Sequence, residues 1–188
     1  TGLYFSALTN GLVDIPEISD SIRQEANNRI KKNGFKSLVE EIDQETSQKI
    51  DTNNPVRVKR AWEVLRSTGR CLNSWHSDTP KPTLDLNMCK AILVDGKVSL
   101  INHRINKRFD QMMGKGLIKE AESNLANWNK SHPSSKAIGA RELIAFLNNN
   151  ISKDQLREKI IIATRQYAKR QRTWFRSKMK NWEKYIIE

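Results

Sequence analysis

Cysteine is scarce in this sequence, since only Cys71 and Cys89 occur among its 188 residues. They form no CxxC pair, whereas a structural zinc site takes four cysteine or histidine ligands, typically at short spacings. His76, His103 and His132 show no ligand spacing with one another. The sequence therefore encodes neither a disulfide framework nor a zinc site. We expect no metal-ligating residue here, and a reducing cytoplasm as the setting.

Long apolar runs are also missing. A membrane-spanning helix needs about 20 consecutive apolar residues, and no segment approaches that length. Residues 1–5 lack an initiator Met and resemble neither a signal peptide nor a transit peptide. We therefore expect no membrane partner, and we interpret Thr1 as a position inside a longer protein.

Acidic residues are too few to balance the basic ones. The chain has 33 Lys and Arg against 21 Asp and Glu, which gives a formal net charge of +12. Hydrophobic residues make up 37%, enough for one ordinary core or a core with a small lobe. The composition therefore indicates a globular protein whose natural partner is a polyanion.

The spacing of apolar residues predicts a mostly α-helical chain with a few short strands. Asn54 is expected to cap a helix that begins at Pro55 and stops at Gly69. The run Lys90–Asp95 is expected to form a buried strand, and residues 73–85 a surface loop. The remaining predicted helices cover residues 19–32, 37–50, 101–113, 116–129, 135–148 and 152–180.

Positive charge is concentrated near the end of the chain, where residues 151–180 hold ten Lys or Arg against two acids. At about 100° per residue on a helix, four of these cations fall within about 60° of arc. We call them the basic ridge: Arg165, Lys169, Arg172 and Arg176. Such a ridge suits contact with phosphates.

The opposite side of this helix is expected to face the core through Ile160, Ala163, Tyr167 and Trp174. The alternative interpretation of the ridge is a solvated helix face, which is what most charge runs are. The scarcity of acids counts against that alternative, because neighbouring like charges on a helix repel by a few tenths of a kcal/mol per pair.

Two smaller basic clusters remain open to either interpretation. Arg57, Lys59 and Arg60 follow a helix N-terminus, where free N–H groups favour anions. Arg104 could bind a diphosphate, or it could pair with Asp110 or a nearby Glu. No Ser, His and acid combination stands out, and Gly114-Lys115-Gly116 lacks the spacing of a phosphate-binding loop. Local motifs alone therefore identify no catalyst.

Five segments together resemble, in order and spacing, the bacterial tRNA dimethylallyltransferase (tRNA isopentenyltransferase) family. They are Thr1-Gly2-Leu3-Tyr4, the run NPVRVKRAWEV at 54–64, RINKRFDQMM at 104–113, AIGAR at 137–141 and ATRQYAKRQRTW at 163–174. The resemblance spans essentially the whole chain. The family often has Gln at Val56, Arg or a similar residue at Lys136 and an aromatic residue at Ala140, so this sequence departs from it there.

The resemblance implies an activity: transfer of a dimethylallyl group from dimethylallyl diphosphate to N6 of the adenine 3′-adjacent to the anticodon, in tRNAs that read codons starting with U. It implies Mg²⁺, bound mainly through an N-terminal part and the diphosphate. It also implies that the phosphate loop, a catalytic Asp and a catalytic Thr precede Thr1. The chain alone is therefore expected to be inactive.

The resemblance also implies an architecture and a set of site residues. Residues 1–15 and 55–188 would belong to the C-terminal part of a P-loop-kinase-like α/β core. Residues 16–54 would form an all-α insertion lobe that contacts the tRNA anticodon arm. The enzyme would be a monomer. The catalytic residues would be Arg104, which would contact the diphosphate, and Thr1, which would lie along the tRNA path. The RNA-binding residues would be Arg23, Arg57, Lys59, Arg60, Lys136, Gly139, Arg141, Arg165, Lys169, Arg170, Gln171, Arg172, Trp174 and Arg176.

Two other functions compete with this enzyme. A non-catalytic helical RNA-binding module would account equally well for the basic ridge. A DNA-binding regulator ranks last, because it needs a recognition helix beside a tight turn, while the basic residues here spread over three separated helices.

Overall fold

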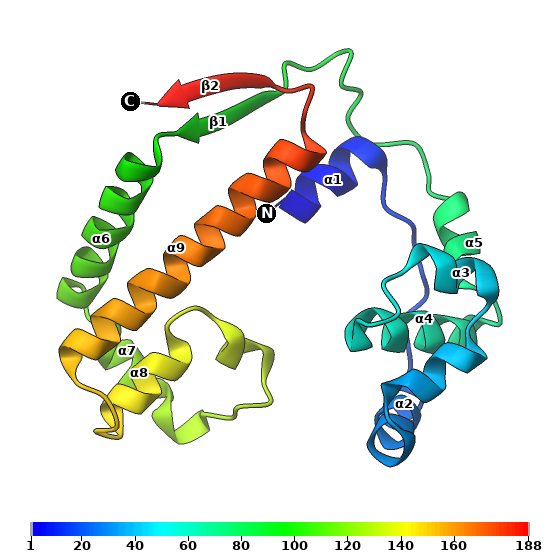
Figure 1. Ribbon diagram of the computed structural model, residues 1–188, viewed down its shortest axis with the longest axis horizontal. Helices are drawn as coiled ribbons and strands as arrows, with labels where there is room; N and C mark the ends of the chain where they lie inside the picture. The colour runs from blue at the N-terminus through cyan, green and yellow to red at the C-terminus, as the bar shows by residue number, and fades with distance from the viewer. Residues whose placement is uncertain (1, 188) are drawn as a thin grey trace. The chain divides into compact units, whose positions relative to one another are not determined.

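The computed structural model describes residues 2–187, which are mostly helical with one small two-stranded sheet (Figure 1). This confirms the expectation of a mostly α chain with a few short strands. The chain divides into two compact units. The N-terminal unit consists of Leu3–Cys89, and the C-terminal unit consists of Gly2 and the chain from Lys90 onward.

Helix ends in the N-terminal unit lie where capping residues predict them. Helix α2 (Asp20–Asn33) begins after Ser19, whose hydroxyl accepts from the Ile22 N–H, and ends at Gly34. In α4 (Pro55–Thr68) the Asn54 side chain caps the start, and Gly69 ends the helix in the left-handed conformation at φ 66°. Helix α1 (Gly2–Asn10) was not predicted, because its apolar residues are consecutive and show no helical period.

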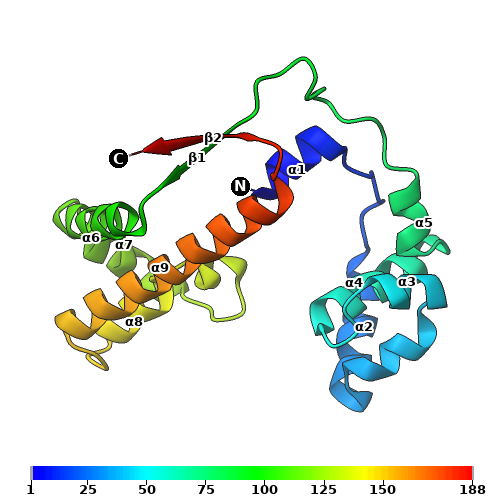
Figure 2. The same cartoon turned by 45° about the horizontal axis from the view of Figure 1, so that its top comes forward.

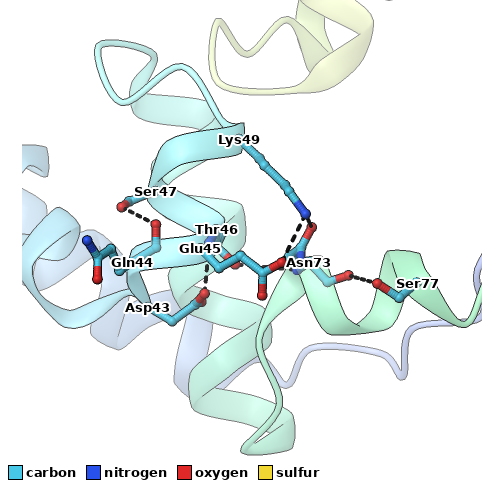
Figure 3. Close-up of polar contacts among 8 residues, drawn as sticks. All are labelled: Asp43, Gln44, Glu45, Thr46, Ser47, Lys49, Asn73 and Ser77. Carbon is cyan, nitrogen blue, oxygen red and sulfur yellow. Dashed lines mark hydrogen bonds and ion pairs between the residues drawn. The ribbon is translucent and has the colours of Figure 1, made fainter.

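The predicted helix at 37–50 is wrong in one respect, since it is two shorter elements. A 3₁₀ helix, η1 (Phe35–Glu41), precedes α3 (Gln44–Lys49). Asp43 separates them because its carboxylate accepts from the Thr46 N–H at 2.7 Å and so starts a new helix (Figure 3). The predicted loop at 73–85 likewise begins inside a short helix, α5 (Leu72–Ser77).

Elements α2, η1 and α4 share one core. It contains Ala26, Leu38, Ile42, Val58, Ala61 and Trp62. Trp62 is the largest of the fully buried side chains, and its indole N–H donates to Glu41 Oε2 at 2.9 Å, so its one polar atom is satisfied. Residues 16–54 therefore pack on α4, and their role as an RNA-contacting lobe stays a prediction.

The sheet of the C-terminal unit joins two strands that lie far apart in sequence. Strand β1 (Ile92–Gly96) pairs in parallel with β2 (Glu183–Ile187), with Ile92 opposite Glu183 and Gly96 opposite Ile187. Figures 1 and 2 both show the strands side by side. Strand β1 confirms the predicted strand, but the expectation that it is buried is wrong, because Ile92 is 42% and Val94 60% exposed. Strand β2 was not predicted, because no local pattern indicates its partner.

Between the strands lie α6 (Val98–Gly114), α7 (Leu117–Asn124), η2 (Leu125–Asn127), η3 (Pro133–Lys136), α8 (Ala140–Leu147) and α9 (Lys153–Lys178). The predicted helix at 116–129 is therefore α7 followed by η2, and the one at 135–148 is η3 followed by α8. Gly139 breaks the latter at φ 91°, and a Cβ there would lie 3.1 Å from Ile160 Cδ1. This position requires glycine.

The second core packs α6, α8 and the first half of α9 together. It contains Phe109, Leu143, Leu156, Ile160 and Ile161. Ile160 is buried as expected, but the expectation for Tyr167 is wrong, because that residue is 42% exposed. This core ends before Tyr167 is reached. Within residues 2–187, no helix combines the length and the apolar character that crossing a bilayer requires.

Candidate nucleic-acid interface

The four side chains of the basic ridge line one groove, with a volume of about 470 Å³. The opposite wall is the start of α6, which contributes Val98, Ile101 and Asn102. Arg165, Lys169 and Arg176 are exposed, and Arg172 is half-buried. The structure therefore places the four cations that the helical spacing predicted on one face around a single groove. The exposed Val98 and the neighbouring Ile101 form its apolar side.

A carboxylate from β1 holds two of these cations. Arg172 Nε donates to Asp95 Oδ1 at 3.1 Å, and Arg176 donates through Nη2 to Asp95 Oδ2 at 3.0 Å. Arg165 donates to Asn106 Oδ1 at 3.2 Å. Asp95 was not among the predicted site residues, and the one signal for it in the sequence is that an acid ends the predicted strand.

Asp95 stays ionised near neutral pH. Burial acts to raise its pKa, but hydrogen bonds from the Gly96 N–H, Arg176 and Arg172 outweigh burial and lower the pKa below its ordinary value. The ridge thus carries four cations and one fixed anion. Each guanidinium has five N–H donors, so both arginines keep donors for a further anion while Asp95 limits their motion.

The other α9 residues predicted to bind RNA lie beside the ridge. Lys169, which belongs to the ridge itself, forms no ion pair within residues 2–187. The Arg170 guanidinium lies 5.9 Å from the centre of the exposed Tyr167 ring. Gln171 and Trp174 are half-buried, and the Trp174 ring meets Phe175 edge-on at 5.3 Å. The end of α9 therefore combines cations with aromatic surface.

Arg104 does not pair with Asp110, so that alternative is wrong. Asp110 instead accepts from Arg157 Nη2 at 3.2 Å, and that guanidinium lies over the Phe109 ring. Arg104 is exposed on α6 and forms no ion pair in the described part of the chain. It does not line the ridge groove. Thr1, its predicted partner in the reaction, lies outside the described residues.

In the N-terminal unit the predicted RNA-binding side chains differ in whether they are bonded to other residues of the chain. Arg57 and Arg60 are exposed. Lys59 donates to Asn27 Oδ1 at 2.6 Å and lies 3.5 Å from Glu63 Oε1, a buried carboxylate oxygen. Arg23 is exposed, and its Nε donates to the Ile18 carbonyl at 3.1 Å. Lys59 therefore has a structural task whatever else it binds.

The last predicted cluster lies around the start of α8. Lys136 and Arg141 are exposed, while Gly139 has no side chain and its backbone is buried, so this glycine presents little surface to an RNA. Across residues 2–187, no three His, Cys, Asp or Glu side chains gather closely enough to hold a metal ion. The described side chains therefore do not form a magnesium site of their own.

Comparison with known proteins decides the family. The family model for IPP transferase matches residues 1–178. The chain belongs to the IPP transferase family. This confirms the resemblance that the sequence motifs carried.

Relatives within the IPP transferase family are close. A tRNA dimethylallyltransferase of Cereibacter sphaeroides (strain ATCC 17029) is 46% identical over 182 residues, which cover 97% of this chain and 58% of that protein. One from Ruegeria sp. (strain TM1040) is 44% identical, covering 98% of this chain and 62% of that protein. The chain thus spans about three-fifths of the length of these curated relatives.

Solved structures of IPP transferases confirm the fold class. The tRNA delta(2)-isopentenylpyrophosphate transferase of Staphylococcus epidermidis matches 99% of this chain and 61% of its own, at 31% identity and a TM-score of 0.53. A eukaryotic dimethylallyltransferase acting on tRNA reaches a TM-score of 0.71 at 21% identity, covering all of this chain and 49% of its own, which shows a shared fold alone.

Proposed function

We propose that this chain takes part in transferring a dimethylallyl group from dimethylallyl diphosphate to N6 of the adenine 3′-adjacent to the anticodon, in tRNAs that read codons starting with U. One observation carries the RNA-binding part: all four cations of the basic ridge line one groove. Membership of the IPP transferase family and the names of the relatives support the reaction. Neither favours a non-catalytic RNA-binding module.

The role assigned to this chain is to hold the anticodon stem-loop. The ridge, the pair Arg57 and Arg60, and the pair Lys136 and Arg141 would each contact phosphates, which position an RNA without reading its sequence. The target adenine has to leave its stack before its amine can reach the prenyl carbon, and loop bases leave at low cost. A cytoplasmic, monomeric enzyme with tRNA as its substrate is part of this proposal.

Arg104 is proposed to contact the diphosphate. Its guanidinium is exposed and unpaired by any carboxylate in residues 2–187, so its donors remain available to an anion. A cation there would stabilise the negative charge that grows on the leaving diphosphate as the carbon–oxygen bond breaks. Lys59 and Asp95, in contrast, are proposed to stabilise the fold, through the ion pair of Lys59 with Glu63 and those of Asp95 with Arg172 and Arg176.

The proposal that this chain binds the anticodon stem-loop is tested by titrating the 188-residue chain with that RNA at two salt concentrations. We expect tight, salt-sensitive binding that prefers a loop with the target adenine over one with changed loop bases. Lys169→Ala should weaken binding and reduce the slope of log K against log salt by about 0.7–0.9. Lys153→Ala, in the first turn of the same helix but off the ridge, is the matched control.

Equal binding to both loops, or equal effects of Lys169→Ala and Lys153→Ala, would contradict this proposal. The catalytic part needs a separate assay. Prenyl transfer to the stem-loop should appear only when a polypeptide carrying the family's phosphate loop is added to the chain. Activity of the chain alone would contradict the assignment of the catalytic Asp and Thr to residues before Thr1.

A further inference from the structure

Trp128 lies in the connection after η2 and lines two hollows of the C-terminal unit that the basic ridge does not touch. The larger, about 730 Å³, is bounded by α7, η3 and α8, and the smaller is about 390 Å³. The hollows share Trp128 and Ile144. A half-buried indole thus forms part of the wall of both.

The larger hollow has the chemistry of a site for a flat, partly polar ring. Leu117, Ala140 and Leu143 give it apolar walls. Asn127 and His132 also line it, and their side chains make no hydrogen bond within residues 2–187. Apolar walls with a few convergent polar groups are typical of small-molecule sites, and this volume lies within their usual range.

The smaller hollow has the chemistry of a phosphate site. Lys130 and Arg141 line it together with Asn148 and Asn150. Neither cation forms an ion pair in the described part of the chain. Glu120, in contrast, lines the larger hollow, where a carboxylate would repel a phosphate but can accept from a base N–H.

We propose that the larger hollow is a nucleobase subsite, in which one unpaired base of a bound RNA stacks on Trp128. The adjoining phosphate lies on Lys130 and Arg141, and the base edge faces Asn127 and His132. This inference rests on the proposed function, because the base belongs to the same RNA. Charge complementarity selects this occupant: an aromatic wall next to unpaired cations is the arrangement that binds single-stranded nucleic acid.

The test measures the affinity of the 188-residue chain and two variants, Trp128→Leu and Trp128→Phe, for an anticodon stem-loop. Further RNAs each carry an abasic nucleotide at one loop position. Trp128→Leu should bind the intact loop about tenfold more weakly, which is the usual scale for loss of one stacked base. Trp128→Phe should restore most of the affinity, since its ring still stacks. Thermal unfolding of each variant checks its fold.

The abasic RNAs separate stacking from packing. One of them should bind the unaltered chain about tenfold more weakly and should lose nothing further with Trp128→Leu, as a double-mutant cycle requires. If Trp128→Leu weakens the intact and all abasic RNAs equally, Trp128 supports the fold and the subsite is overturned. If it has no effect on any RNA, the subsite is also overturned.

A second variant covers the case in which Trp128→Leu does not fold. Exposed Lys130 and Arg141 can both be changed to Ala, and the slope of log K against log salt should then fall by about 1.4. An unchanged slope overturns the subsite. Lys169→Ala distinguishes the two proposals: if it weakens binding while the Trp128 and Lys130 variants do not, only the subsite fails. If no variant alters binding, the proposed function fails as well.

Discussion

Arg172 donates through Nε to Asp95 Oδ1 at 3.1 Å, which ties the middle of the basic ridge to the end of β1. Arg176 holds the other carboxylate oxygen at 3.0 Å. The Asp95 side chain is 15% exposed and that of Arg172 is 23% exposed, so this contact is shielded from water. Two of the four ridge cations, Arg172 and Arg176, are therefore held by a carboxylate of β1, whereas Lys169 forms no ion pair within residues 2–187.

Asp95→Asn is expected to lower the free energy of unfolding while leaving RNA affinity intact or raising it. The substitution removes two charge-assisted hydrogen bonds, each worth about 1.5–3 kcal/mol when buried, so we expect a loss of about 2 kcal/mol in this partly exposed site. It also removes the anion beside the ridge. Urea unfolding and RNA titration check the two effects. A fall in RNA affinity in a folded variant would show that Asp95 orients the arginines for RNA.

The stability of the protein should fall in acid through two carboxylates. Folding lowers the pKa of Asp95 below 3.8, as described. It also lowers the pKa of Asp43, where burial acts to raise it but hydrogen bonds from the Thr46 side chain and backbone outweigh burial. Between the folded and unfolded pKa values the folded state binds fewer protons, so its stability rises with pH.

This contribution is complete above the unfolded pKa near 3.8 and is lost as the pH falls through the lower folded value. Unfolding free energies measured from about pH 6 to pH 2.5 should therefore decline at the acid end. Asp43→Asn retains a capping side chain, and with Asp95→Asn it should make the decline shallower. If the unfolding free energy of the double variant declines as steeply at low pH as that of the unaltered chain, other carboxylates cause the decline.

Lys59→Ala should destabilise the N-terminal unit, because it leaves the Glu63 carboxylate buried without its cation. Glu63 Oε1 has no hydrogen-bond partner within residues 2–187, and Lys59 Nζ lies 3.5 Å from it. We expect a loss of about 2 kcal/mol in urea unfolding. Arg60→Ala, at an exposed neighbour, should change stability by less than about 0.5 kcal/mol.

Adding Glu63→Gln to Lys59→Ala should recover much of that loss, since a neutral amide costs less to bury than a carboxylate. If the single and double variants are equally unstable, the ion pair is not the cause. This pair of variants also decides whether reduced RNA binding by Lys59→Ala reflects a lost phosphate contact or a weakened fold.

Arg104→Ala should reduce kcat/KM for prenyl transfer about 100-fold in the reconstituted reaction, the scale expected for loss of one charge-stabilising donor. RNA affinity should stay unchanged, because the proposed partner of Arg104 is the diphosphate. Arg108→Ala, one helical turn later and also exposed, is the control and should retain activity. Reduced RNA affinity with unaltered catalysis would place Arg104 on the RNA instead.

Local chemistry made some elements predictable. Asn54, Pro55 and Gly69 delimit α4 because a cap, a residue without an N–H and a left-handed terminator act within a few residues of themselves. The same local rules explain the break at Asp43. The apolar residues Ile42 and Ile50 flank a polar stretch that one helix could also span, so the sequence pattern did not separate the two elements at Asp43.

Other features required partners distant in sequence. Strand β2 is a strand because Glu183 and its neighbours pair with β1 across about ninety residues, as Ile92 opposite Glu183 shows. Tyr167 is exposed because the core beneath α9 ends at Ile161, a limit set by where α6 and α8 pack. Helical period alone predicted a longer buried face.

The sequence by itself determined the helical character, the excess of positive charge, the grouping of the ridge and the family, because each depends on residue types at short or regular spacing. The tertiary structure decided which cations are held and which are available. Asp95 engages Arg172 and Arg176, Glu63 engages Lys59, and Lys169 and Arg104 form no ion pair within residues 2–187. Ion pairs depend on distances of a few ångströms between side chains from different elements, and those distances exist only once the chain has folded.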